Sequence, residues 1–146
     1  LLRHLEAGAQ RAGRSPRQVT VAPQALAYVT RSQDELEEAR RLLRAHLAFY
    51  VGGMGTYYNN QMRRYGFVQE AERILERWQA RDREGAAAQV SEEMLDRMTI
   101  YGPEERCWER VQEYGRAGAD VVNIGFPYGV SDEAIDRTLE ALAPAR

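Results

Sequence analysis

The 146-residue sequence contains no lysine, so all 20 of its basic residues are arginines. They stand against 22 acidic residues, and the net charge is −2. The sequence therefore lacks the basic excess that is typical of proteins that bind nucleic acids. The absence of lysine has two interpretations: the codon preference of a GC-rich genome, which we favour, or an array of functional arginines.

Cysteine and histidine are scarce as well. Cys107 is the only cysteine, which excludes an internal disulfide and a zinc site built on cysteines. Its sequence neighbours are acidic, so we expect an inert thiol. His4 and His46 have no carboxylates at ligand spacing, and we predict no metal site. His46 lies on a helical face, where it is either a proton carrier or a residue of the core boundary.

Long apolar runs are missing too. None approaches the ~18 residues that a membrane-spanning helix needs, and we find no signal peptide. Together with the single cysteine, this favours a cytoplasmic protein without a membrane partner. The length predicts one domain over residues 1–146. Because the sequence starts inside a helical pattern and without methionine, we expect the natural chain to begin upstream of Leu1.

Two segments are rich in β-prone residues. We predict a strand over Gln18 to Thr30, with an edge position or a bulge at Pro23, and a more buried strand over Asp120 to Phe126. Apolar residues recur at helical spacing elsewhere, and the alternation of helices with strands predicts an α/β fold. The helical segments are Leu1 to Arg14, Ser32 to Gly53, Gly55 to Tyr65, Val68 to Arg81, Arg83 to Val90, Ser91 to Met98, Pro103 to Gly118 and a last one capped by Ser131.

Two aromatic segments are candidate ligand-binding sites. The first combines flat rings with amide donors and acceptors, which suits a planar aromatic ligand or, equally, a protein interface; it consists of Tyr57, Tyr58, Asn59 and Asn60. The second follows the later strand, where ligand sites gather in open sheets and barrels, although a plain turn is the alternative; it consists of Phe126, Pro127 and Tyr128. The glycines of 52–55 follow a helix, so they predict a helix end and not a phosphate-binding loop.

Eight short segments carry a family resemblance through their order and spacing. They are Gly8-Ala9, Ala12 to Pro16, Ala27 to Val29, Leu47 to Val51, Arg64 to Phe67, Val90 to Asp96, Gly102 to Glu105 and Ala117 to Asp120. Together they resemble the C-terminal part of the luciferase-like, flavin- or deazaflavin-dependent oxidoreductases. The branch that uses coenzyme F-420 and resembles methylene-tetrahydromethanopterin reductase is the most similar. One departure is that Gly102 and Pro103 are adjacent, where the family has Gly-Thr-Pro.

The resemblance implies the C-terminal part of a TIM barrel, with a helical insertion between its last two strands. A whole barrel takes roughly 250 residues, so this would be an incomplete one. The predicted strands would be the seventh and the eighth. The family moves a hydride between coenzyme F-420, or alternatively FMN, and a small organic substrate. Its members often form homodimers.

The same resemblance places the candidate residues at the catalytic face of the barrel. Tyr28 and Thr30 would contact the cofactor, whereas Tyr57 to Asn60, as a possible lid, and Phe126 to Tyr128 would contact the substrate. We assign no catalytic residues, because in this family the first strands carry most flavin contacts, and we expect this portion alone to be inactive. The alternative is a non-catalytic barrel remnant, a structural or interaction module whose open sheet edges would require a partner chain.

Overall fold

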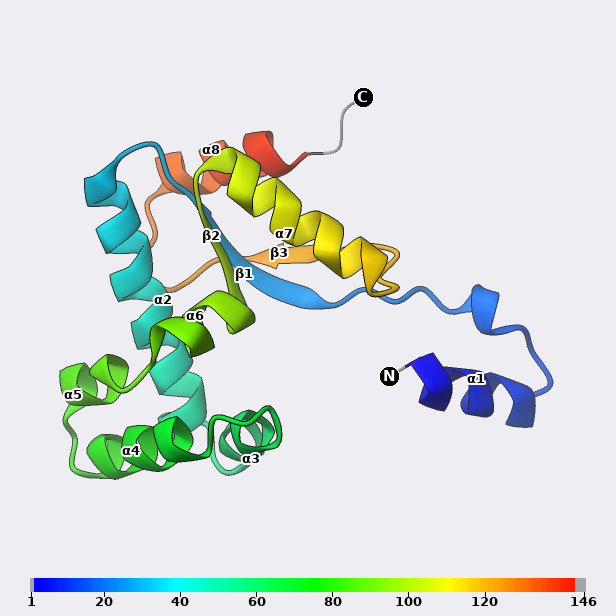
Figure 1. The fold of residues 1–146 in the computed structure, drawn as a ribbon, viewed down its shortest axis with the longest axis horizontal. Coiled ribbons are helices and arrows are strands. Elements are labelled where there is room, and N and C mark those ends of the chain that lie inside the picture. The colour runs from blue at the N-terminus through cyan, green and yellow to red at the C-terminus, as the bar shows by residue number, and fades with distance from the viewer. Residues whose placement is uncertain (1, 144–146) are drawn as a thin grey trace.

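The computed structural model describes residues 2–143, which form a three-stranded parallel sheet and eight α-helices. The strands are β1 (Gln24–Val29), β2 (Thr99–Gly102) and β3 (Asn123–Gly125), in the order β2-β1-β3 (Figure 1). β2 pairs with the last four residues of β1, and β3 pairs with the first three. β1 is therefore the central strand, and its two neighbours are offset along it.

The helices largely follow the segments that the sequence predicts. Ser32, Ser91 and Ser131 each accept a hydrogen bond from the backbone N–H three residues further on, at 3.2, 3.2 and 3.3 Å, so these serine N-caps are confirmed. The helices are α1 (Leu2–Arg11), α2 (Gln33–Gly53), α3 (Tyr57–Arg64), α4 (Val68–Gln79), α5 (Arg83–Ala88), α6 (Glu92–Met98), α7 (Glu104–Arg116) and α8 (Asp132–Leu142), with a short 3-10 helix η1 (Pro16–Gln18).

The first predicted strand is shorter than expected and lies in a different place in the sheet. The chain forms η1 where we predicted the strand to begin, and β1 starts at Gln24, directly after Pro23. Proline has no N–H to donate to a ladder, so the strand begins one residue beyond it. The expected edge position or bulge at Pro23 is wrong, because Pro23 precedes the central strand.

The second predicted strand is also too long, and its expected burial is wrong. The backbone N–H groups of Asp120 and Val121 donate to the carbonyl of Val21, at 2.9 and 3.3 Å, before the ladder begins. The remaining strand, β3, lies at an edge of the three-stranded sheet and is partly exposed. A run of apolar residues therefore marked an edge strand here.

Strand β2 was not predicted at all. Its four residues are all buried and pair in parallel with β1. Four buried residues are too few to show the periodicity that distinguishes a strand from the end of a helix. The residues just before them were predicted to be helical. Residues 2–143 thus contain three strands where the sequence predicted two.

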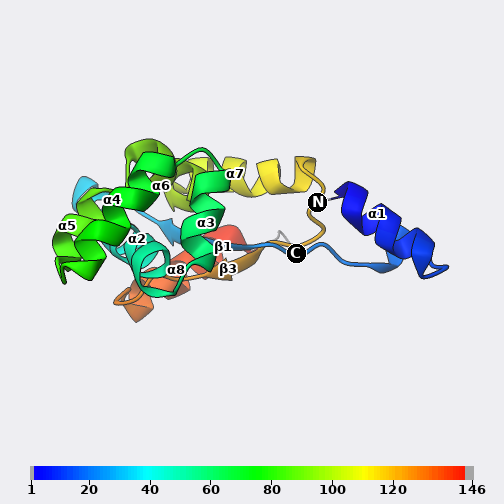
Figure 2. The ribbon, with the colours of Figure 1, turned by 90° about the horizontal axis from the view of Figure 1, so that it is seen from below.

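The two faces of the sheet have separate cores. Helices α7 and α8 cover one face, where Ala25, Ala27 and Val29 pack with Ile100 and Cys107 (Figure 1). The other face of β1 points toward α2 and the helices that follow it, which bury the larger core. α1 stands apart from this body in both views (Figures 1 and 2).

The end of α2 explains two of the glycines. A Cβ at Gly52 would lie 2.6 Å from Cβ of Trp78, and one at Gly53 would lie 2.7 Å from the Trp78 ring, so both positions are small because α4 packs on them. The helix stops just before Gly55, whose φ of +71° favours glycine. The glycines thus end a helix, as predicted.

Side chains of α8 complete the hydrogen bonding of β1. Thr138 Oγ1 accepts a hydrogen bond from Val29 N–H at 3.0 Å, and Arg137 Nε donates one to the Val29 carbonyl at 3.1 Å. Thr138 is fully buried. β3 does not reach this part of β1, so a helix supplies the partners that a neighbouring strand would otherwise provide.

Candidate functional site

A hollow of about 410 Å³ lies between β1 and the helices α2 and α3. Its size lies within the range of small-molecule sites, and rings and aliphatic side chains form most of its wall. The lining residues are Gln24, Leu26, His46, Leu47, Tyr50, Tyr57, Tyr58, Gln61, Met62, Tyr65 and Met98.

Five rings form a continuous series, which we call the aromatic ladder: Tyr128, His46, Tyr50, Tyr58 and Tyr57. All of them except Tyr128 line the hollow. His46 stacks on Tyr128 at 4.7 Å and on Tyr50 at 4.9 Å between ring centroids, nearly parallel to both. Tyr58 meets Tyr50 edge-on at 4.8 Å, and Tyr57 meets Tyr58 edge-on at 5.2 Å. The ladder joins the two aromatic segments that the sequence singled out.

The ladder is electrically neutral. Burial lowers the pKa of His46, which favours the uncharged imidazole near neutral pH. A hydrogen bond with Tyr128 raises the pKa of Tyr50, so its phenol also stays protonated. Neutral rings beside a small number of polar groups suit a planar organic ligand better than a charged one.

Asn59 does not point into the hollow. Its Nδ2 donates to the carbonyls of Ala71 at 2.8 Å and Val51 at 3.3 Å, and its Oδ1 accepts from Arg63 Nε at 2.8 Å. The buried amide therefore ties α3 to α2 and α4, and the structure assigns it a structural role instead of the expected contact with substrate. Asn60 is exposed and does not line the hollow.

The segment after β3 contacts the site through one side chain. Tyr128 stacks on His46, but it does not line the hollow and 63% of its surface is exposed. Pro127 is buried and Phe126 is partly buried, and neither lines the hollow. A role for these two in substrate binding stays a prediction.

Tyr28 and Thr30 lie at the carboxyl end of β1 and are both buried. Burial raises the pKa of the Tyr28 phenol, and Thr30 N–H donates to the Gly102 carbonyl at 2.8 Å. Tyr28 is covered, whereas Thr30 also lines a hollow of about 250 Å³ together with Arg31 and Arg137. Their expected contact with a cofactor stays a prediction, and we derive no chemical step from it.

The sequence did not indicate two of the site residues on β1. Gln24 and Leu26 alternate with the residues that face α7 and α8, so strand periodicity places them on the side of the hollow. A Cβ at Gly125 would lie 2.7 Å from Gln24 Nε2. Gly125 therefore leaves room for the Gln24 amide beside the hollow.

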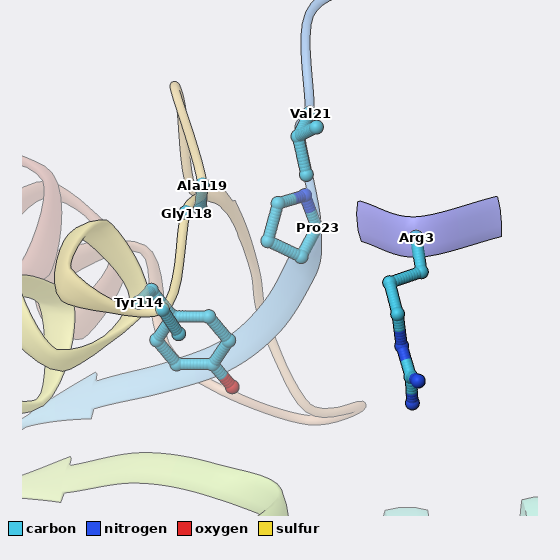
Figure 3. Close-up of a pocket in the computed structure, with 7 residues that line it drawn as sticks. Arg3, Val21, Pro23, Tyr114, Gly118 and Ala119 are labelled. Atoms are coloured by element: carbon cyan, nitrogen blue, oxygen red, sulfur yellow. The ribbon is translucent and has the colours of Figure 1, made fainter. Parts of the chain in front are cut away.

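A second hollow, of about 450 Å³, lies at the opposite end of β1. Arg3 of α1 extends into the space between α1 and the side chains of Pro23 and Tyr114 (Figure 3). It lies beside the start of the strand, the end that serves stability and not chemistry in α/β barrels. We assign no ligand to it.

Cys107 is buried, its Sγ lies 3.4 Å from the Gly102 carbonyl, and burial raises the pKa of the thiol to about 11. These surroundings support the prediction of an inert thiol. Over residues 2–143, no group of three or more His, Cys, Asp or Glu side chains is placed to hold a metal ion. No helix in that part of the chain is long and apolar enough to cross a membrane.

Residues 1–121 match the model of the luciferase-like monooxygenase family, and the chain belongs to this family. The resemblance that the sequence motifs indicated is confirmed. Among curated relatives, the chain is 28% identical over 130 residues to a 5,10-methylenetetrahydromethanopterin reductase of Methanopyrus kandleri, covering 88% of this chain and 36% of the relative. It is 30% identical over 132 residues to the enzyme of the same name from Archaeoglobus fulgidus, covering 86% and 38%.

The fold matches a solved structure of the same kind. The coenzyme F-420-dependent tetrahydromethanopterin reductase from Methanopyrus kandleri superposes with a TM-score of 0.73 and 25% identity, over 97% of this chain and 39% of that one. The predicted α/β class is confirmed. The chain spans a little over a third of the length of these relatives.

Proposed function

We propose that the chain is part of an oxidoreductase that transfers a hydride between coenzyme F-420 and a small organic substrate. The observation that carries this proposal is the superposition of 97% of the chain on an F-420-dependent reductase. The family match over residues 1–121 supports it independently. FMN is the alternative cofactor, because the family includes flavin-dependent members.

In this proposal β1 and β3 are the seventh and eighth strands of a barrel. They are direct parallel neighbours, as consecutive barrel strands must be. The segment between them contains α2 to α7 together with β2, and it corresponds to the predicted insertion. β2 pairs with the other edge of β1, which is the edge where the preceding strand of a barrel would lie, so the sheet of the described residues departs here from the order of a regular barrel.

The residues of this chain would serve the substrate side of the reaction. The aromatic ladder offers ring surfaces on which a planar substrate can stack, and Leu26 and Met98 exclude water from the same hollow. When bound, coenzyme F-420 supplies the redox chemistry. The relatives are much longer than this chain, and we place most contacts to the cofactor in the parts that this chain does not span.

We also propose, from the family alone, that the intact protein acts as a homodimer in the cytoplasm with no nucleic-acid partner. Size-exclusion chromatography with light scattering on the intact protein tests the dimer. A monomer at micromolar concentration would contradict it.

Binding of the cofactor tests the central proposal. The intact protein is purified, its mass is measured by denaturing mass spectrometry, and it is titrated with F-420 and, separately, with FMN. We expect saturable binding of F-420 and tighter binding than for FMN. Tighter FMN binding would identify the alternative cofactor. Binding of neither would refute the oxidoreductase and favour a non-catalytic barrel remnant.

A further inference from the structure

We propose that His46 is a substrate-binding residue, which donates a hydrogen bond from Nε2 to an acceptor at the edge of a planar ring held in the hollow. This inference rests on the proposed function, because it takes the hollow to be the substrate side of the site. It goes further by naming the side chain that recognises the ring and the chemical group that it recognises.

The position of the imidazole is fixed by its neighbours. The ring stacks on Tyr50 and Tyr128, at interplanar angles of 14° and 20°. Tyr128 comes from the loop after β3, so the stack joins α2 to this loop. These contacts restrict the rotation of the imidazole.

The two ring nitrogens of His46 have different surroundings. Nδ1 is buried and has no hydrogen-bond partner. Nε2 forms no hydrogen bond with the described residues, and it is not among the buried atoms that lack a partner. His46 lines the hollow, so Nε2 is the nitrogen that a ligand can reach.

The neutral ring carries one proton, and its location follows from these surroundings. Among the described residues the ring stacks on the phenols of Tyr50 and Tyr128, and burial is what lowers its pKa. Placing the single proton on Nε2 keeps the donor where a partner can accept it, whereas an N–H at Nδ1 would stay unsatisfied. His46 therefore presents a neutral N–H donor to the hollow.

The presence of histidine in this ladder needs an explanation beyond packing. Phenylalanine would stack on the same two tyrosines and leave no buried nitrogen without a partner. The sequence instead has a polar ring at the wall of a hollow. Of the two rings, only the imidazole can offer an N–H donor to a ligand acceptor in the hollow.

The expected ligand is a planar heterocycle with a carbonyl oxygen or a bare ring nitrogen at its edge. A pterin ring has both kinds of acceptor. The Gln24 amide also lines the hollow and can bind a second edge of such a ring. We therefore use folic acid, a stable compound with a pterin ring, as the probe.

The test compares two replacements of His46 in the intact protein. His46→Phe keeps a ring between the tyrosines and removes the donor, whereas His46→Gln places an amide N–H near the position of Nε2. Folic acid binding is measured by calorimetry, and near-ultraviolet circular dichroism checks that the aromatic ladder is retained. His4→Phe, at an exposed position on α1, is the control.

We expect His46→Phe to weaken folic acid binding about tenfold, since a hydrogen bond of ordinary strength corresponds to roughly this factor. His46→Gln should stay within about threefold of the unaltered protein, and His4→Phe should not differ from it. The 15N resonance of His46 Nε2 should shift when folic acid is added, which a purely structural histidine would not show.

Equal binding by His46→Phe and the unaltered protein would overturn the proposal, as would a lack of folic acid binding by the unaltered protein. F-420 binding is measured in parallel on the same preparations. A protein that binds F-420 but not folic acid contradicts this inference alone. A protein that binds neither F-420 nor FMN contradicts the proposed function itself.

Discussion

Replacement of Asn59 by alanine should destabilise the protein strongly without affecting a substrate contact. The side chain supplies both donors and its acceptor to hydrogen bonds within the chain, at 2.8 to 3.3 Å. The Val51 carbonyl lies in the last turn of α2, where helix carbonyls lack partners within the helix. In this way Asn59 caps α2 from α3.

The magnitude follows from the groups that lose their partners. A buried polar group left without a partner costs about 1–3 kcal/mol. Two carbonyls, of Val51 and Ala71, lose the Asn59 donor, although Ala71 can keep its bond within α4. The Arg63 side chain is 34% exposed, so water can replace its lost acceptor. We therefore expect Asn59→Ala to lower the free energy of unfolding by about 2–4 kcal/mol.

The adjacent residue provides a matched control. Asn60 is exposed and its side chain makes no hydrogen bond within the described chain, so Asn60→Ala should change the free energy of unfolding by less than about 0.5 kcal/mol. Urea unfolding of both variants, with equal slopes, measures the difference. If Asn59→Ala were as stable as Asn60→Ala, or if it raised KM at unchanged stability, Asn59 would be a ligand-binding residue and our reasoning would be wrong.

Three further predictions follow from buried groups. Thr138→Val should lower the free energy of unfolding by about 1–3 kcal/mol, because Val29 N–H loses its acceptor, whereas Thr138→Ser should be nearly neutral. Calorimetry that found the two variants equally stable would contradict this. Cys107 should resist thiol reagents until urea unfolds the chain, since its pKa is about 11; rapid labelling of the native protein would refute this. Folding lowers the pKa of His46 below 6.5, so the unfolded chain takes up the proton more readily than the folded one. The free energy of unfolding should therefore fall as the pH drops below about 6.5. In His46→Phe, the urea midpoint should fall less over the same pH range. Identical pH profiles for the two proteins would exclude that contribution.

The sequence predicted the features that depend on near neighbours along the chain. The serine caps at Ser32, Ser91 and Ser131 need only residues three positions away, and all three form. The helical segment predicted over Pro103 to Gly118 also forms, as α7. Such local patterns hold because the same backbone geometry recurs wherever the helix forms.

The features that depend on distant segments were harder to predict. Asn59 and Asn60 are identical in type and adjacent, and only the packing of α3 on α2 and α4 decides which of them is buried. The stack of His46 on Tyr128 joins a helix to a loop far later in the chain. The sequence could indicate that both rings were available for a site, but not that they would meet.

The bonds from α8 to β1 have a consequence for synthesis on the ribosome. Val29 is bound by Arg137 and Thr138, which follow it by 108 and 109 residues. β2 and β3 also come long after β1, so the central strand has no described ladder partner until most of these residues have been translated. Contacts of such separation form slowly and late. The described sheet is therefore complete only once β3 and α8 have been translated, and until then the apolar face of β1 that α8 covers stays open to aggregation.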